Sequence, residues 1–147
     1  HGGVFMIGTA SMSGVHYGHE TIDYARLLTL GLNGIRDEAR GRQAALDIAR
    51  LDDFERWQFL EAVCTALDGA ADFAARYSVL AGEMAAAESD QVRKAELQKI
   101  ADICARVPAE PAKTLQEALQ AIWLTHIVLR NEGWGPGMSF GRLDQYL

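Results

Sequence analysis

Long apolar runs and an excess of basic residues are both missing from this chain of 147 residues. No run approaches the ~20 apolar residues of a transmembrane helix, and no basic start with a short apolar segment marks a signal peptide. The 14 lysines and arginines are outnumbered by 20 aspartates and glutamates, which gives a net charge of −6. This balance argues against non-specific binding to nucleic acid or to an anionic membrane, and we expect a cytoplasmic protein.

Cysteine is also scarce. Cys64 and Cys104 are the only two, and they lie far apart within helical patterns, so we expect buried, reduced thiols in place of a disulfide. Neither stands at a predicted helix N-terminus or beside an obvious base, and apolar surroundings raise the pKa of a thiol. Core packing is therefore favoured over a nucleophilic role for both. The CxxC, HExxH and GK[ST] patterns of metal and phosphate sites are absent as well.

Helical periodicity is what the chain does contain, between two glycine-rich ends. Residues 1–18 hold five glycines around the apolar run Val4 to Ile7, which predicts a short strand followed by a loop. A helical pattern begins at Glu20, and Gly31 and Gly34 within it predict close packing or a bend. Glycines return in the stretch NEGWGPGMSFGR, which predicts a loop or a kinked approach to a strand.

Three further helices are predicted from their capping residues. We expect the second helix to start with Asp52 as its N-cap, and the third with Ser89. Thr114 and Glu117 form a T-x-x-E capping box before the fourth helix. The fold class is therefore mainly α, with about four helices, one short N-terminal strand and a glycine-rich C-terminal loop or strand.

Two of these helices carry an unusual amount of apolar surface. The second is rich in alanine on nearly every face, and such a helix is normally buried on several sides. Because a chain this short offers few elements to bury it, we expect the chain to be a piece of a longer polypeptide. The fourth helix has a predicted core stripe on which His126 lies, as a hydrogen-bonded core histidine: Leu115, Leu119, Ile122, Trp123, His126 and Leu129.

A polar corner precedes the first helix, in the stretch GVHYGHETIDYARLL. One interpretation is a metal site formed by His16, His19, Glu20 and Asp23, although a third strong ligand is missing nearby. The other interpretation is structural: Asp23 favours the positive helix N-terminus, and His19 is a capping or solvated residue. At the other end of the chain, a buried Arg–Asp arrangement beside an aromatic would hold loop backbone in place. Such an arrangement is predicted for Arg142 and Asp144 in GRLDQYL.

Five blocks of sequence resemble the glycyl radical enzymes, the family with a pyruvate formate-lyase-like domain. The branch is similar to the diol dehydratases and the C–N, C–C or C–S lyases, such as glycerol dehydratase and choline trimethylamine-lyase. The resemblance covers almost the whole chain, and its blocks keep the family's order and spacing. They are GH-x3-DY at 18–24, GLNGIRDEA at 31–39, ARYSVLAGEMAAAESD at 75–90, RKAELQKIADICARVPAEPAKTLQEALQAIW at 93–123 and SFGRLDQYL at 139–147.

The resemblance implies radical chemistry inside a ten-stranded α/β barrel wrapped by helices. In this family no cofactor is bound directly. An activating enzyme, with S-adenosylmethionine and an iron–sulfur cluster, takes a hydrogen atom from a backbone glycine. The radical passes to a cysteine, whose thiyl form attacks a small-molecule substrate in an interior that excludes solvent and oxygen. The partners implied are the substrate, the activating enzyme and a second copy in a homodimer.

The chain has no match to the family's GCVE-like cysteine loop or its RVAG-like glycine loop. The resemblance therefore implies that residues 1–147 form a partial domain, without the N-terminal region, the cysteine loop and the glycyl radical domain. We expect this segment to be inactive alone. Cys64 and Cys104 do not match the thiyl-forming cysteine, so no residue of the chain is assigned a catalytic role.

The resemblance assigns substrate-pocket positions to two regions. The histidine of the family's GH pair contacts substrate hydroxyls, and here it is His19, whose neutral imidazole can both donate and accept a hydrogen bond. In the loop before GRLDQY, Pro136 and Gly137 replace a His-Ser pair that reaches the substrate in glycerol dehydratase. This replacement argues against glycerol and for a bulkier or less polar substrate. Trp134 and Ser139 complete the predicted pocket wall.

Asp23 and Tyr24 match the acid and tyrosine that follow the GH pair, and we predict that they support the start of the helix. The sequence thus predicts a segment of a lyase or dehydratase that cleaves a C–O, C–N, C–C or C–S bond. The alternative is a non-catalytic helical structural or interaction domain derived from such an enzyme. A metal-binding helical domain using His16 and His19 is a third interpretation.

Overall fold

The structure is a computed structural model that describes residues 20–132 and 137–147. The elements follow one another as β1 (Glu20–Thr21), α2 (Tyr24–Ala44), α3 (Leu51–Ala87), α4 (Gln91–Cys104), α5 (Leu115–Glu132), β2 (Met138–Ser139) and α6 (Leu143–Tyr146). The prediction of a mainly helical segment is confirmed. The predicted strand at Val4 to Ile7 lies outside the described residues.

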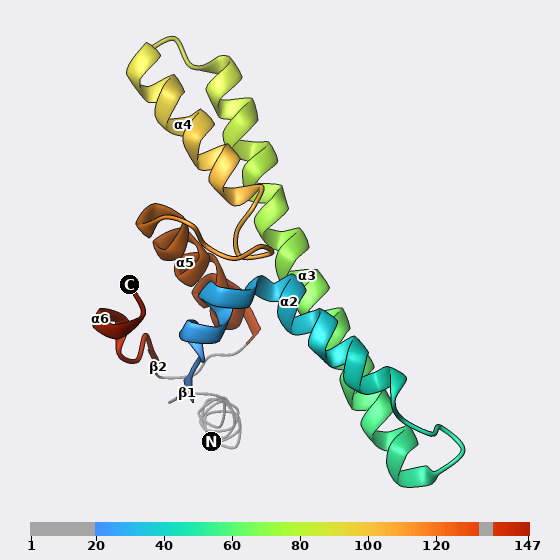
Figure 1. Cartoon of the computed structure of the whole chain (residues 1–147). Helices are drawn as coiled ribbons and strands as arrows, with labels where there is room; N and C mark the ends of the chain where they lie inside the picture. The colour runs from blue at the N-terminus through green and yellow to red at the C-terminus, as the bar shows by residue number, and fades with distance from the viewer. Residues whose placement is uncertain (1–19, 133–136) are drawn as a thin grey trace, which may run out of the picture.

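The long helix α3 runs through the whole arrangement, and helices α2 and α4 pack against it (Figure 1). Helix α2 packs along the first part of α3 and α4 packs back along its last part, so that two helical hairpins extend in opposite directions. Helix α5 lies near the middle, beside the short strands and α6. Among the described residues, none of the helices combines the length and the apolarity needed to cross a bilayer.

Helix α2 starts later than predicted and bends at the predicted place. Its first residue is Tyr24 and not Glu20, because Glu20 and Thr21 pair with β2. At Gly31 the backbone leaves the helical region, with φ 67° and ψ 172°. The N–H groups of Leu32 and Asn33 then donate to the carbonyls of Pro108 and Ala109, at 2.9 and 3.0 Å. The kink therefore provides donors that dock the loop between α4 and α5.

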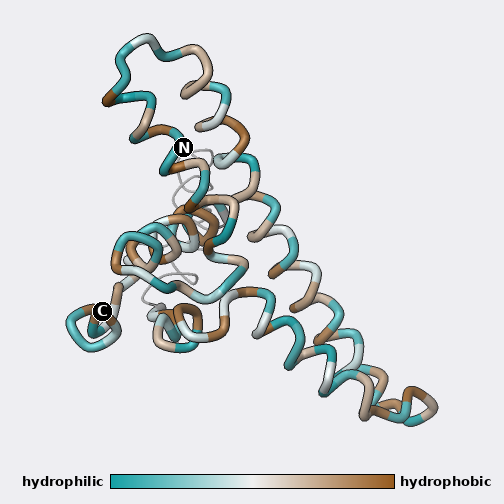
Figure 2. Tube along the Cα trace, turned by 45° about the horizontal axis from the view of Figure 1, so that its top comes forward, coloured by the Kyte–Doolittle hydropathy of each residue, from teal (hydrophilic) through white to brown (hydrophobic). Residues whose placement is uncertain are grey.

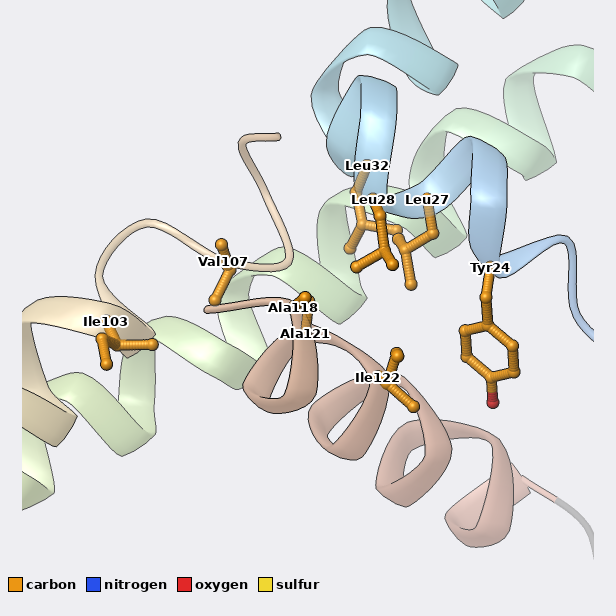
Figure 3. Close-up of a cluster of buried hydrophobic side chains, with 9 residues drawn as sticks. All are labelled: Tyr24, Leu27, Leu28, Leu32, Ile103, Val107, Ala118, Ala121 and Ile122. Atoms are coloured by element: carbon orange, nitrogen blue, oxygen red, sulfur yellow. The ribbon is translucent and has the colours of Figure 1, made fainter. Parts of the chain in front are cut away.

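The core forms where α2, the end of α4 and α5 meet (Figure 3). Figure 2 shows hydrophobic residues gathered at this junction, whereas along α3 they alternate with hydrophilic ones. The buried cluster comprises Tyr24, Leu27, Leu28, Leu32, Ile103, Val107, Ala118, Ala121 and Ile122. Apolar surface that is removed from water stabilises a fold by roughly 25 cal/mol per Å². Burial of this cluster therefore stabilises the junction of the three helices.

The predicted core stripe of α5 is largely wrong. Leu115, Leu119 and Trp123 are 61%, 45% and 55% exposed. The buried face consists mainly of Ala118, Ala121, Ile122 and Leu124. Small side chains let α5 approach its neighbours closely, and the larger apolar side chains then lie on a face that no described residue covers. Hydrophobic spacing alone could not distinguish these two faces.

The described residues bury α3 on only part of its surface, as expected for a chain with few elements to cover an alanine-rich helix. Its buried positions are Cys64, Ala74, Ala81 and Ala85, whereas Phe59 and Val79 are 68% and 63% exposed. Helices α2 and α4 each cover only part of its length (Figure 1). The prediction for the cysteines is confirmed: both are free and buried, and burial raises the pKa of the Cys104 thiol.

Two predicted N-caps are displaced by a residue or two. Helix α3 begins after Arg50, so that Asp52 lies in the first turn. There its negative charge interacts favourably with the positive end of the helix dipole. Helix α4 is capped by Asp90 and not by Ser89. The Asp90 carboxylate accepts hydrogen bonds from the N–H groups of Val92 and Arg93, at 2.8 and 3.1 Å.

This cap gives a direct test of the α4 boundary. We expect Asp90→Ala to lower the free energy of unfolding by about 1 kcal/mol, since two N–H groups lose their acceptor. Ser89→Ala is the matched control and should change little, because the Ser89 side chain accepts neither bond. Urea unfolding of both variants measures the difference, and equal effects would contradict the assignment of Asp90 as the cap.

Candidate functional site

The two regions predicted to line a pocket meet in one parallel strand pair. Glu20 of β1 is paired with Met138 of β2, and Thr21 is paired with Ser139. The strand pair thus places the start of α2 beside the segment that precedes α6, although the two lie at opposite ends of the sequence (Figure 1). His16, His19, Trp134 and Pro136 lie outside the described residues, so the predictions for them remain predictions.

Asp23 and Tyr24 lie directly after β1. Asp23 is the N-cap of α2, and its carboxylate accepts a hydrogen bond from the Arg26 N–H at 3.1 Å. Tyr24 is fully buried, and this burial raises the pKa of its hydroxyl. The Tyr24 ring lies 6.3 Å from the ring of Phe140, measured between centroids. The start of the helix is therefore fixed by a cap on one side and an aromatic contact on the other.

In the second segment predicted to line the pocket, the structure describes Gly137 and Ser139. Ser139 is exposed, and its hydroxyl oxygen accepts a hydrogen bond from the Gly141 N–H at 3.0 Å. A Cβ added at Gly137 would meet none of the described residues within 4 Å. At Gly141 φ is +62°, and an added Cβ would lie 2.9 Å from Thr21 Cγ2, so glycine allows the close approach to β1.

The predicted buried arrangement of Arg142 and Asp144 is wrong. Both side chains are exposed, and no hydrogen bond or ion pair joins them within the part of the chain that the structure describes. The reason is that residues Leu143–Tyr146 form the short helix α6, with Arg142 as its N-cap. Its Leu143 and Tyr146 turn towards the core, and the charged residues are left on the outer face.

A histidine on α5 adds a feature that the sequence did not reveal. His126 was predicted to be a hydrogen-bonded core residue, but its buried Nδ1 has no hydrogen-bond partner among the described residues. A buried polar atom without a partner costs about 1–3 kcal/mol. The His126 ring instead lies 4.8 Å from the Phe140 ring and is stacked at 6.2 Å on the Trp123 ring.

Phe140 connects the start of α2 with helix α5. Its ring contacts both Tyr24 at the start of α2 and His126 on α5, and it directly follows β2. The sequence signal was a single aromatic between Ser139 and Gly141, which does not reveal its partners. In the portion of the chain that is described, no group of three or more histidines, cysteines or acidic residues is placed to hold a metal ion.

The whole chain belongs to an enzyme family. Residues 2–147 match the family described as pyruvate formate lyase-like, and the chain is therefore a member of this family. This finding confirms the resemblance inferred from the five sequence blocks.

Three relatives illustrate the match. The isethionate sulfite-lyase of Desulfovibrio desulfuricans is 47% identical over 126 residues, which are 84% of this chain and 15% of that protein. The structure of the B12-independent glycerol dehydratase from Clostridium butyricum has a TM-score of 0.85 and 37% identity, over 88% of this chain and 16% of that one. A glycyl radical enzyme from Archaeoglobus fulgidus has a TM-score of 0.81 and 36% identity, over 88% and 17% of the two chains. The chain thus spans about one sixth of the length of these relatives.

Proposed function

We propose that this chain is part of a glycyl radical lyase or dehydratase and forms part of its substrate pocket. The observation that carries the proposal is the match of the whole chain to the family, together with the close fit to solved glycyl radical enzymes. The thiyl-forming cysteine and the radical glycine come from other parts of the polypeptide. A separate activating enzyme installs the radical, and the intact enzyme is a homodimer with a ten-stranded barrel.

The proposed reaction removes a hydrogen atom from a small hydroxylated substrate and expels a neighbouring group. Two observations favour sulfite as that group over water lost from glycerol. The isethionate sulfite-lyase is 47% identical to this chain. In addition, the family resemblance implies that Pro136 and Gly137 stand where a glycerol dehydratase has a His-Ser pair. On this proposal, the cavity is lined by His19, Trp134, Pro136, Gly137 and Ser139. Asp23 and Tyr24 hold the start of α2.

The intact enzyme tests the proposal under anaerobic conditions. After treatment with its activating enzyme and S-adenosylmethionine, we expect a glycyl radical signal in electron paramagnetic resonance. The activated enzyme should release sulfite from isethionate and turn over glycerol much more slowly. Absence of the radical would favour a non-catalytic domain derived from the family. A radical with dehydration but without sulfite release would contradict the proposed leaving group.

His19 is the most direct substitution in this pocket. We expect His19→Ala in the activated enzyme to keep the radical signal and to lower kcat/KM at least 10-fold, because one hydrogen bond to the substrate is lost. His16→Ala is the matched control, since this neighbouring histidine has no assigned role. Unchanged turnover in His19→Ala would remove it from the site, and loss of the radical would indicate a structural role.

A further inference from the structure

The orphaned ring nitrogen of His126 is the buried polar atom that most needs an explanation. Its Nδ1 has no hydrogen-bond partner among the described residues, and neither has the buried Oγ1 of the preceding Thr125. Buried polar groups in folded proteins are nearly always hydrogen-bonded, to protein, water or ligand. A leucine or phenylalanine would fill a similar space without the free-energy cost of burying an unpaired polar atom. The presence of histidine therefore indicates that the nitrogen has a function.

The surroundings of His126 connect it to both described pocket walls. Its ring contacts the rings of Trp123 and Phe140, and Phe140 in turn contacts Tyr24. Phe140 directly follows Ser139 of β2, and Tyr24 stands three residues after Thr21 of β1. His126 thus belongs to an aromatic array that includes residues following both strands.

The stacking also restricts what His126 can do. Aromatic neighbours at the ring faces contribute packing and no hydrogen bonds, so polar contact is left to the ring edge, where the nitrogens are. A neutral imidazole offers one donor and one acceptor. A hydroxyl oxygen or an anionic oxygen of a small polar molecule can pair with such a ring nitrogen.

We propose that His126 is a substrate-binding residue, whose Nδ1 hydrogen-bonds an oxygen of the small hydroxylated substrate, directly or through one water molecule. This inference rests on the proposed function and adds a contact from α5 to a pocket so far assigned only to the ends of the chain. The role is binding and specificity; no proton transfer to or from His126 is invoked.

Two substitutions at His126 test the contribution of the nitrogen and that of the aromatic ring separately. His126→Phe keeps an aromatic ring beside Trp123 and Phe140 and removes both nitrogens. His126→Asn keeps a polar amide near the position of Nδ1 and loses the ring. In the intact, activated enzyme with isethionate as the probe, we expect His126→Phe to raise KM at least 10-fold, with the radical signal and melting temperature retained. His126→Asn should keep KM within about 3-fold of the wild-type value.

Thr125→Val is the matched control. It removes the other orphaned polar atom, on a side chain about 100° away around the helix and outside the aromatic array, and it should leave KM unchanged. Wild-type KM in His126→Phe, or a larger loss in His126→Asn than in His126→Phe, would overturn the inference and leave His126 a packing residue. These results differ from a failure of the proposed function, in which the wild-type enzyme itself forms no radical or turns over neither isethionate nor glycerol.

Discussion

Gly31→Ala is expected to destabilise the protein by roughly 3–5 kcal/mol, the largest effect of any single methyl group in the described structure. The φ of +67° at Gly31 is costly for any residue with a Cβ, and the space is already occupied. An added Cβ would press on the Ala109 carbonyl oxygen and lie 2.6 Å from the Glu110 carbonyl carbon. These are backbone atoms, so relief requires the loop between α4 and α5 to move away from α2.

The loss should extend beyond the substituted position. The N–H groups of Leu32 and Asn33 donate to this loop, and the Ala112 N–H donates to the Leu28 carbonyl at 3.0 Å. A displaced loop would weaken all three bonds, and α5 follows directly. Urea unfolding measures the loss of stability, and hydrogen exchange at the amides of Leu32 and Asn33 should accelerate.

Gly41→Ala is the control on the same helix. Gly41 is exposed, and an added Cβ would meet no atom of the described structure within 4 Å. Alanine should therefore stabilise α2 by up to about 1 kcal/mol, by its higher helix propensity. Similar effects at both glycines would show that the kink at Gly31 is not held by the loop.

Glu117→Gln is expected to cost roughly 2–3 kcal/mol, the second largest effect. The Glu117 carboxylate accepts one hydrogen bond from the Lys113 N–H at 2.6 Å and another from Arg106 Nε at 3.0 Å. The side chain is only 12% exposed. A glutamine has one acceptor oxygen in place of two, so one donor loses its partner and Arg106 loses its counter-charge. The pair joins the end of α4 to the start of α5.

The same contacts predict a dependence on pH. The backbone hydrogen bond from Lys113 and then the Arg106 guanidinium lower the pKa of the Glu117 carboxyl from its ordinary value of 4.5. A lowered pKa in the folded state means that the stabilisation is fully present above the ordinary value and is lost as the pH falls through the lowered one. The difference in stability between the wild type and Glu117→Gln should therefore shrink in acid. A difference that stays constant down to about pH 2 would contradict this account.

Glu96→Gln is the matched control for the charge. Glu96 accepts a hydrogen bond from Arg93 at 2.8 Å within α4, but both side chains are at least half exposed. Exposed pairs of this kind contribute little, because water screens the charges and the side chains lose entropy. The substitution should leave the free energy of unfolding nearly unchanged at every pH.

Local signals in the sequence predicted the elements that depend on local interactions. The T-x-x-E pattern predicted the start of α5, and the structure has the Glu117 N–H donating to Thr114 Oγ1 at 3.2 Å. The carboxylate of Glu117 turns to the Lys113 N–H and to Arg106, which follows from the loop that α4 and α5 share. The bend at Gly31 was predicted because glycine weakens a helix, but the loop that fills the bend lies far along the chain.

The sequence alone determined the helical class, the buried state of the two cysteines and, through five blocks in register, the family. Each of these is set by composition, by spacing within one segment or by short motifs. Tertiary structure decided which face of α5 is buried, the pairing of β1 with β2 and the outward position of Arg142 and Asp144. It also left the buried nitrogen of His126 without a partner among the described residues. These features depend on contacts between residues far apart in the chain, and the spacing of residues within one segment carries no information about what will lie against it.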